Sequence, residues 1–237
     1  MINTQTMNLD HIEVIAFDAD DTLWMNEPYF RESEAKFASL LSDWMPEHDI
    51  NRALFAIEMK NLPILGYGVK AFIVSMIETA IEISGGRASA ELIQKIIQIG
   101  KDQLEREVVI LDGVKEVLEE LSGKYRLVVA TKGDLKEQEG KLQKSGLEKY
   151  FHHIEIVTEK TQVEYTKLIQ HLDILPSNFL MIGNSLKSDI LPVLETGAFA
   201  FHIPYHTTWE HEKVDDEVEH PKFTSLDKMT DLLAHLQ

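Results

Sequence analysis

The stretch IEVIAFDADDTL, residues 12–23, joins a mostly apolar run to a cluster of acidic and hydroxyl side chains. Residues 12–17 show little alternation of apolar and polar residues, which is typical of a strand buried on both faces of a parallel sheet. Asp18 and Asp20 follow directly, where the chain leaves the sheet and turns, so both carboxylates can reach one pocket. We therefore expect a buried first strand that carries two chemically useful carboxylates at its carboxyl end.

Four further runs predict strands, and helical patterns separate them. The expected strands are residues 126–130 (RLVVA), 179–182 (FLMI), 198–203 (AFAFHI) and, more weakly, 153–157. The expected helices are residues 113–122, 134–145, 161–172 and 185–196. This alternation predicts an α/β fold with a doubly wound parallel sheet. Ligands bind beyond the carboxyl ends of the strands in such sheets, where Asp18, Thr131 and Gly183 are expected.

One long stretch, residues 25–108, breaks the alternation. It shows helical periodicity and no convincing strand, with expected helices at residues 29–44, 47–60, 69–83 and 88–107. The stretch is too long for a crossover connection and suits a helical domain inserted into the sheet domain. We therefore predict a core domain of residues 1–24 and 109–237. Residues 25–108 would form a helical cap domain that sits as a lid above Asp18.

The overall charge restricts the partners of this protein. Forty acidic residues stand against 23 basic ones, which gives a formal charge of −17. Such a surface repels nucleic acids and anionic membranes, so we expect neither as a partner. An anionic substrate would need a local device that reverses the field, such as a metal ion, a lysine or a helix N-terminus. The chain has no cysteine, which excludes disulfides, thiolate metal sites and cysteine nucleophiles.

We expect no targeting or membrane-spanning segment. Residues 1–10 are polar and lack a basic segment followed by an apolar one, so they do not resemble a signal peptide. No apolar run approaches the roughly 20 residues that span a bilayer. We therefore predict a cytoplasmic protein, either a monomer or a homodimer. Residues 210–219 (EHEKVDDEVE) are predicted to form a charged, solvated loop.

The aspartates after the first strand can have different roles. Asp18 can attack phosphorus as a nucleophile, while Asp20 gives a proton to the leaving alkoxide and later takes one from water. Two close negative charges facing a phosphate are unfavourable unless a cation intervenes, and hard oxygen ligands of this kind suit Mg²⁺. Asn184 and Asp189, in the stretch GNSLKSD, add oxygen atoms to the same pocket.

A hydroxyl and two lysines supply complementary groups. Thr131 and Lys132 begin the stretch TKGD, where the Thr131 hydroxyl and adjacent backbone N–H groups can hold phosphate oxygens. Lys160, after the weak strand, can supply the positive charge that links phosphate and nucleophile. Plainer interpretations exist for several of these residues. Asp-x-Asp and the GNSLKSD residues can simply cap helices, and Thr131 can be an ordinary turn residue.

The stretch DADDTL, Thr131, Lys160 and the stretch GNSLKSD, in this order, resemble the four motifs of the haloacid dehalogenase-like (HAD) hydrolase superfamily. The resemblance covers roughly residues 10–24 and 109–205, and the helical insert resembles the α-helical cap of that superfamily. It therefore implies a Rossmann-like core with an inserted cap.

The resemblance also implies roles for individual residues. Asp18 would be the nucleophile and Asp20 the acid/base, with Thr131 and Lys160 as phosphate contacts. Mg²⁺ would be held by the Asp18 carboxylate, the Asp20 backbone carbonyl and the fourth motif, which here contains Asn184 and Asp189.

Two positions depart from the family pattern. The fourth motif usually has Asp where this chain has Asn184, so one negative charge is lost and we expect weaker binding of Mg²⁺. The third motif usually reads Lys-Pro, whereas Lys160 is followed by Thr161. Lys167, about two helical turns further on, is the alternative candidate.

The presence of Asp20 favours phosphoryl transfer. Dehalogenases resemble this chain but lack the second aspartate, since carbon–halogen cleavage leaves no alkoxide to protonate. We therefore predict a Mg²⁺-dependent phosphatase that acts on a small phosphorylated metabolite through an aspartyl-phosphate. A phosphomutase of the same superfamily and a non-catalytic binding protein on this fold are the alternatives.

The cap offers one candidate contact loop, residues 65–68 (LGYG). Tyr67 presents a hydroxyl on an apolar ring, and Lys70 presents a charge. Phosphonatases use a cap amine to form a Schiff base, and Lys70 is the cap lysine nearest to this loop. A helix–helix turn without any contact to substrate explains the same residues equally well.

Overall fold

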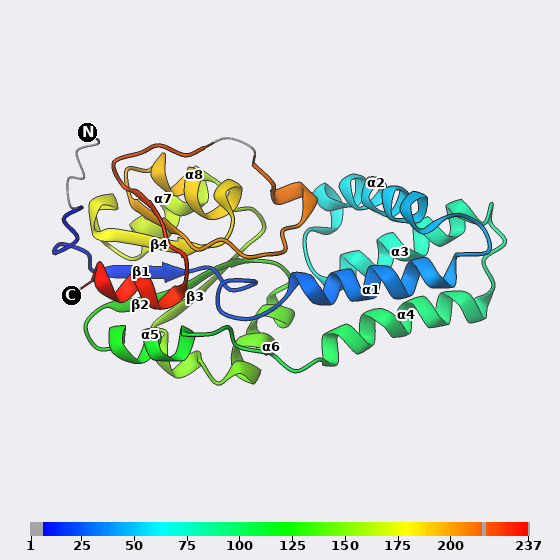
Figure 1. Cartoon of the computed structure of the whole chain (residues 1–237), viewed down its shortest axis with the longest axis horizontal. Helices are drawn as coiled ribbons and strands as arrows, with labels where there is room; N and C mark the ends of the chain where they lie inside the picture. Colours follow the sequence, from blue (N-terminus) through cyan, green and yellow to red (C-terminus); the bar gives the residue numbers. More distant parts are fainter. Residues whose placement is uncertain (1–6, 215–216, 237) are drawn as a thin grey trace. The chain divides into compact units, whose positions relative to one another are not determined.

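The computed structural model describes residues 7–214 and 217–236. Two stretches lie outside the described residues. They are residues 1–6, within the polar N-terminal stretch for which we expected no signal peptide, and residues 215–216, within the predicted charged loop. The chain forms two compact units (Figure 1). The core unit comprises the chain up to Met25, Val108–Lys132 and the chain from Leu142 onward, and the helical unit comprises Asn26–Glu107 and Gly133–Lys141.

Six parallel strands form one sheet in the core unit, in the order β3-β2-β1-β4-β5-β6. They are β1 (Val14–Phe17), β2 (Arg126–Lys132), β3 (His153–Val157), β4 (Phe179–Gly183), β5 (Phe199–His202) and β6 (Phe223–Ser225). In the middle of the sheet, Phe17 lies opposite both Val129 and Ile182. The predicted parallel α/β sheet is confirmed. The strand β6 was not predicted because three residues are too few to show a period.

The helices of the core unit connect these strands. They are α5 (Val114–Leu121), α7 (Gln162–His171) and α8 (Leu191–Leu194), while α6 (Leu135–Ser145) has residues in both units. The helix predicted at residues 185–196 begins differently, as a five-residue π-helical turn, η3 (Leu186–Ile190). Pro192 lies in the first turn of α8 and lacks the N–H that a regular continuous helix would need there. Such π turns are rare and frequently mark functional sites.

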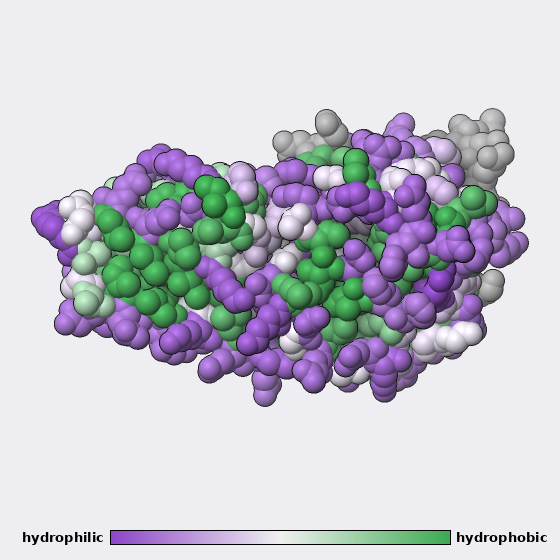
Figure 2. Space-filling model, turned by 180° about the vertical axis from the view of Figure 1, so that it is seen from behind, coloured by the Kyte–Doolittle hydropathy of each residue, from purple (hydrophilic) through white to green (hydrophobic). Residues whose placement is uncertain are grey.

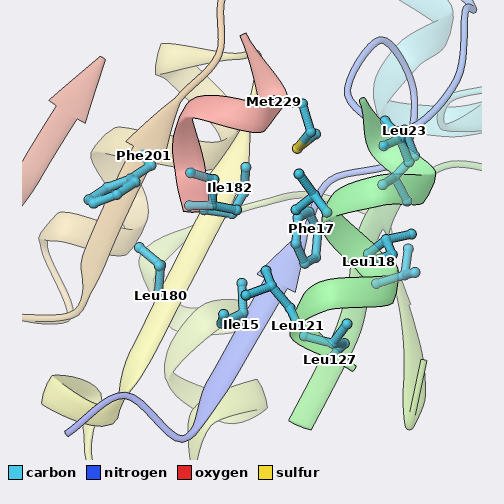
Figure 3. Packing of buried hydrophobic residues seen from close by; sticks show 14 of the residues in the cluster. Ile15, Phe17, Leu23, Leu118, Leu121, Leu127, Leu180, Ile182, Phe201 and Met229 are labelled. Atoms are coloured by element: carbon cyan, nitrogen blue, oxygen red, sulfur yellow. The ribbon is translucent and has the colours of Figure 1, made fainter. Parts of the chain in front are cut away.

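Alternate residues of β1 enter two separate apolar layers. Ile15 and Phe17 pack on the side of α5 and of the C-terminal turn η5 (Met229–Ala234), as Figure 3 shows. Val14 and Ala16 pack on the opposite side, with residues of α7 and α8. All four side chains are fully buried, as expected of a strand between two helical layers. The carboxyl end of β1 is therefore held firmly in place.

Four helices form the helical unit: α1 (Glu27–Leu40), α2 (Glu47–Leu65), α3 (Val69–Ile83) and α4 (Ala90–Glu105). They bury an apolar core of their own, centred on Phe37, Leu54 and Met76. At Gly100 of α4, an added Cβ would lie 2.1 Å from Ile73 Cγ1, so α3 and α4 pack too closely there for any side chain. Among the described residues, no helix is both long and apolar enough to span a membrane.

The face of the chain seen in Figure 2 is mostly hydrophilic and is interrupted by apolar patches. This agrees with the excess of acidic residues in the sequence. The most exposed large apolar side chains are Ile64 of α2, Val163 of α7 and Leu175, which lie on separate elements. Exposed apolar residues on separate elements are normal on protein surfaces.

A cluster of charged side chains is partly buried between α1 and α2. Arg31 lies 3.1 Å from Glu27 and 3.0 Å from Glu34, so it pairs with two carboxylates at once. Glu58 of α2 adds a third carboxylate. Burial, together with the charges of Glu34 and Glu27, raises the pKa of Glu58 to about 8. Near neutral pH, Glu58 therefore holds its proton in a large share of the molecules.

Candidate active site

Three charged side chains meet at the carboxyl edge of the sheet. Asp18 follows β1, Asp189 lies in η3 after β4, and Lys160 lies between β3 and α7. The Lys160 ammonium lies 2.5 Å from Asp18 Oδ1 and 2.6 Å from Asp189 Oδ1. Their side chains are 2%, 9% and 1% exposed for Lys160, Asp18 and Asp189. Residues far apart in the sequence thus form one buried triad with two carboxylates and a single ammonium.

Burial and the neighbouring charges together shift the pKa values of the triad. Burial raises the pKa of Asp18 to about 7, and the nearby Asp189 charge acts in the same direction, against the opposing pull of Lys160. Burial alone would lower the pKa of Lys160, but Asp18 and Asp189 outweigh it and raise that pKa well above its usual value. The lysine therefore stays charged. When both carboxylates are ionised, the triad carries one net negative charge, which favours the uptake of a further cation.

The turn after β1 fixes the orientation of the two aspartates. Asp21 adopts φ of 64°, an uncommon value for a residue with a side chain. The Thr22 hydroxyl donates to Asp18 Oδ2 over 3.0 Å. The indole N–H of Trp24 donates to Asp20 Oδ1 over 2.7 Å, and Asp20 itself is half-buried. The Asp18 carboxylate is therefore held beside Lys160, while the Asp20 carboxylate is held by Trp24 of the turn.

The side chain of Asn184 completes a group of oxygen atoms. Its Oδ1 lies 3.2 Å from Asp18 Oδ2, from the Asp20 carbonyl oxygen and from the Thr22 hydroxyl. Turning the amide would bring its NH₂ group to the same place, where it could donate to all three. From the other side, His202 Nε2 donates to the Asn184 carbonyl over 3.0 Å. With the amide oxygen turned inward, the Asp18 carboxylate, the Asp20 carbonyl and Asn184 together offer the kind of oxygen ligands that fit a hard cation such as Mg²⁺.

This oxygen group uses few charged ligands. In the described part of the chain, no set of three or more His, Cys, Asp or Glu side chains is arranged to hold a metal ion. The two oxygens of Asp189 already accept hydrogen bonds, one from Lys160 and one from the Ser185 N–H at 3.0 Å. A cation at this place would therefore be coordinated mainly by the Asp18 carboxylate, the Asp20 carbonyl and Asn184.

The lysine that contacts Asp18 is Lys160. Lys167, the alternative candidate, lies on α7 with a side chain that is 64% exposed, and it pairs with Glu164 at 2.6 Å. Thr161 serves as the N-cap of α7, with its hydroxyl accepting from the Glu164 N–H. The residue that replaces the usual proline thus starts the helix, which leaves Lys160 in the preceding loop.

Thr131 and Lys132 end β2 close to this group. Thr131 is buried, and its hydroxyl donates to the Lys132 carbonyl over 3.3 Å. The Lys132 ammonium lies 2.6 Å from Glu212 and donates to Ser188 over 2.9 Å. In this structure the Lys132 charge is therefore engaged by the loop after β5, and its contact with phosphate stays a prediction.

Glu212 lies in a more buried environment than we predicted from the sequence. We predicted a solvated loop at residues 210–219, yet the Glu212 side chain is only 13% exposed and binds Lys132, Ser185 and Ser188. Its neighbours in the sequence are mostly acidic, as in an ordinary surface loop. Nothing local distinguishes it, so only the tertiary contacts could have identified it.

The candidate contact loop lies in the helical unit. Lys70 Nζ lies 2.8 Å from both carboxylate oxygens of Asp134, and the Val69 N–H donates to Glu137 Oε2 over 3.0 Å. The hydrogen bond from Lys70 lowers the pKa of Asp134. Tyr67 is half-buried. The loop is thus joined to the start of α6, and the contact of Tyr67 and Lys70 with a substrate stays a prediction.

Comparisons with known proteins agree with the four motifs. Residues 12–193 match the family model of the haloacid dehalogenase-like hydrolases. N-acylneuraminate-9-phosphatase of Mus musculus is 28% identical over 121 residues, which are 49% of this chain and 49% of that protein. The Homo sapiens protein of the same name is 24% identical over 202 residues, 81% of this chain and 82% of that protein. The chain thus spans about half the length of the mouse relative that it matches.

Among the solved structures similar over nearly the whole chain is one with substantial sequence identity. It is a haloacid dehalogenase-like family hydrolase from Xanthomonas campestris, with a TM-score of 0.85 and 38% identity over 95% of this chain and 91% of that one. The family model covers well over half of the chain, and the sheet carries the motifs at its strand ends. The chain therefore belongs to the haloacid dehalogenase-like hydrolase family.

Proposed function

We propose that this enzyme is a Mg²⁺-dependent phosphatase that hydrolyses a small phosphorylated metabolite through an aspartyl-phosphate on Asp18. The observation that carries the proposal is the buried triad of Asp18, Lys160 and Asp189 beside the oxygen group around Asn184. A buried site with an excess of negative charge can accept a phosphate only when a cation is present.

The chain's own residues supply the nucleophile and its environment. An Asp18 oxygen would attack phosphorus, and the Lys160 ammonium would lie beside both the carboxylate and the incoming phosphate oxygens. Thr131 would add a hydroxyl from the end of β2. Bound Mg²⁺ would offset the repulsion between the phosphate and the carboxylates and stabilise the charge that develops on the phosphoryl oxygens. The ion would be held mainly by the Asp18 carboxylate, the Asp20 carbonyl and Asn184. Asp189, the other polar residue of the fourth motif, would contribute chiefly by holding Lys160 in place.

Asp20 would carry the proton transfers. The Trp24 indole N–H donates to Asp20 Oδ1 over 2.7 Å, which fixes the orientation of the carboxyl group. Asp20 would protonate the departing alkoxide and later take a proton from the water that attacks the aspartyl-phosphate. After the alcohol has left, attack of water on phosphorus would break the bond to Asp18, release inorganic phosphate and regenerate the Asp18 carboxylate.

We also propose that the helical unit acts as the cap. It is inserted between β1 and α5, and the Met25 N–H donates to the Val109 carbonyl over 2.9 Å, which joins the two connecting segments at the base of the insert. A hinged insert of this kind can close over a small substrate and admit water afterwards. The relatives are named N-acylneuraminate-9-phosphatases, and acylneuraminates are sugar acids. Phosphate esters of sugar acids therefore belong among the first substrates to test.

The test is release of inorganic phosphate from a panel of phosphorylated metabolites, with and without Mg²⁺. We expect metal-dependent turnover in the wild type and none in Asp18→Asn, while Asp10→Asn, an exposed control, stays active. Mass spectrometry of acid-quenched enzyme should show one added phosphoryl group on the peptide that contains Asp18. Transfer of phosphate to a second hydroxyl of the substrate would indicate the phosphomutase instead. Turnover that survives in Asp18→Asn would refute the mechanism.

A further inference from the structure

Glu212 lies at the centre of a compact polar network in the core unit. It ends η4 (Glu210–Glu212), the short turn that follows β5. Its Oε1 lies 2.6 Å from Lys132 Nζ, and its Oε2 accepts from the hydroxyls of Ser185 and Ser188, both at 2.6 Å. Burial would raise the pKa of Glu212, but Lys132 and the two hydroxyls outweigh it and lower the pKa to about 2. The carboxylate is therefore ionised and fully engaged.

The two serines that Glu212 binds are the residues that shape η3. Ser185 is the N-cap of this turn, and its hydroxyl accepts from the Ser188 N–H over 3.1 Å. The Ser185 N–H in turn donates to Asp189 Oδ2 over 3.0 Å. The other oxygen of Asp189 binds Lys160, which binds Asp18. A continuous series of hydrogen bonds thus runs from Glu212 to the proposed nucleophile.

A second anchor fixes η4 against the same turn. Lys187 donates to the His211 carbonyl over 2.7 Å. On the far side of η3, the Tyr165 hydroxyl of α7 donates to the Ser188 carbonyl over 3.1 Å. The turn is therefore held from η4, from β2 through Lys132 and from α7. Glu212 is the only member of the described network that reaches both serines and Lys132.

We infer that Glu212 is a positioning residue for the fourth motif. It keeps η3 in the shape that presents Asn184 and Asp189 to the proposed Mg²⁺ site, and it touches neither of them directly. Residues that orient metal ligands typically change metal affinity by about 10- to 100-fold when they are removed. The inference rests on the proposed function, because its consequence is measured at the Mg²⁺ site.

The first experiment measures binding of Mg²⁺ to the folded protein by titration calorimetry, without substrate. We expect Glu212→Ala to raise the Kd for Mg²⁺ by about tenfold or more. Glu212→Gln keeps one acceptor oxygen and should fall between the wild type and Glu212→Ala. The matched control is Glu210→Ala in the same turn, whose side chain is 61% exposed and pairs with Lys213, and its Kd should equal that of the wild type.

A second experiment separates positioning from simple charge neutralisation. If Glu212 served only to balance Lys132, the double variant Lys132→Met/Glu212→Ala would regain wild-type affinity for Mg²⁺. We expect it to remain weak, since the bonds to the two serines are still missing. Ser185→Ala should weaken Mg²⁺ binding as well, without disturbing the pair between Glu212 and Lys132. Recovery in the double variant would overturn the inference.

Thermal unfolding of each variant shows whether it is folded at the titration temperature. Glu212→Gln is nearly isosteric, so it keeps the test valid even if Glu212→Ala does not fold. Wild-type affinity in both Glu212→Gln and Ser185→Ala would refute the positioning role while leaving the phosphatase proposal intact. A wild type that neither binds Mg²⁺ nor releases phosphate would overturn the proposed function, and this inference with it.

Discussion

Replacing Lys160 by Met tests the buried triad most directly. The substitution removes the ammonium that lies 2.5 Å from Asp18 and 2.6 Å from Asp189, and it keeps a side chain of similar length. Two buried carboxylates then face each other without a counter-charge. Removing one partner of a buried ion pair usually costs about 3–5 kcal/mol. This is a large part of the roughly 5–15 kcal/mol by which native proteins are stable.

The expected shift in melting temperature follows from this free energy. For a chain of this size, each kcal/mol corresponds to roughly 2–4 °C, so we expect Lys160→Met to melt roughly 6–20 °C below the wild type in the absence of metal. Saturating Mg²⁺ should restore part of the loss, because the ion would neutralise the same carboxylates. Differential scanning calorimetry with and without Mg²⁺ measures both effects.

Lys167→Met provides the matched control, because this lysine is exposed and forms a pair three residues apart on α7. Exposed pairs of this kind contribute at most about 1 kcal/mol, so its melting temperature and its turnover should stay close to those of the wild type. A Lys160→Met variant that melts with the control would refute the reasoning about the triad. Loss of turnover in Lys167→Met alone would return the third motif to Lys167.

Three further outcomes are expected from single substitutions. In Gly183→Ala, the new Cβ would lie 2.3 Å from the fourth-motif carboxylate, so turnover should fall by about 100-fold, whereas Gly140→Ala in open space should keep it. Burial raises the pKa of Glu58 from 4.5 to about 8, so its contribution to stability is complete below about pH 4.5 and is lost as the pH rises through 8. Chemical denaturation should therefore show that, between pH 5 and 9, the free energy of unfolding of Glu58→Gln rises relative to that of the wild type by up to about 4 kcal/mol. A difference in free energy that stays constant with pH would contradict the shifted pKa. Trp24→Phe removes the hydrogen bond to Asp20 and should slow hydrolysis of alkyl phosphates by about tenfold but spare aryl phosphates, whose leaving groups need no proton; equal losses for both would exclude this role.

The order of strands and helices could be predicted because the signals that define it are local. Residues 14–17 are continuously apolar because β1 is covered on both faces, and this pattern is visible without any knowledge of its neighbours. The four helices of the insert also show their period in neighbouring residues, because each buries one face in the apolar core of the helical unit. Short elements carried no such signal: β6 has three residues, and the π turn η3 looks like the start of a regular helix.

The candidate site was predictable in part. Asp18, Lys160 and Asp189 each follow a strand of one parallel sheet, and the carboxyl ends of such strands share an edge, so their meeting follows from topology. Which lysine belongs to the triad depended on where α7 begins, and Thr161 decides that by capping the helix.

The sequence alone therefore determined the fold class, the family motifs and the two aspartates, since each is recognised from a short local stretch of residues. The tertiary structure alone decided the partners of Lys132, the burial of Glu212 and the joining of Lys70 to Asp134. These contacts connect segments that are remote in the chain. Their energies depend on the exposure and on the geometry of several side chains at once. Neither the exposure nor the geometry can be predicted from the type of a residue or from its spacing in the sequence.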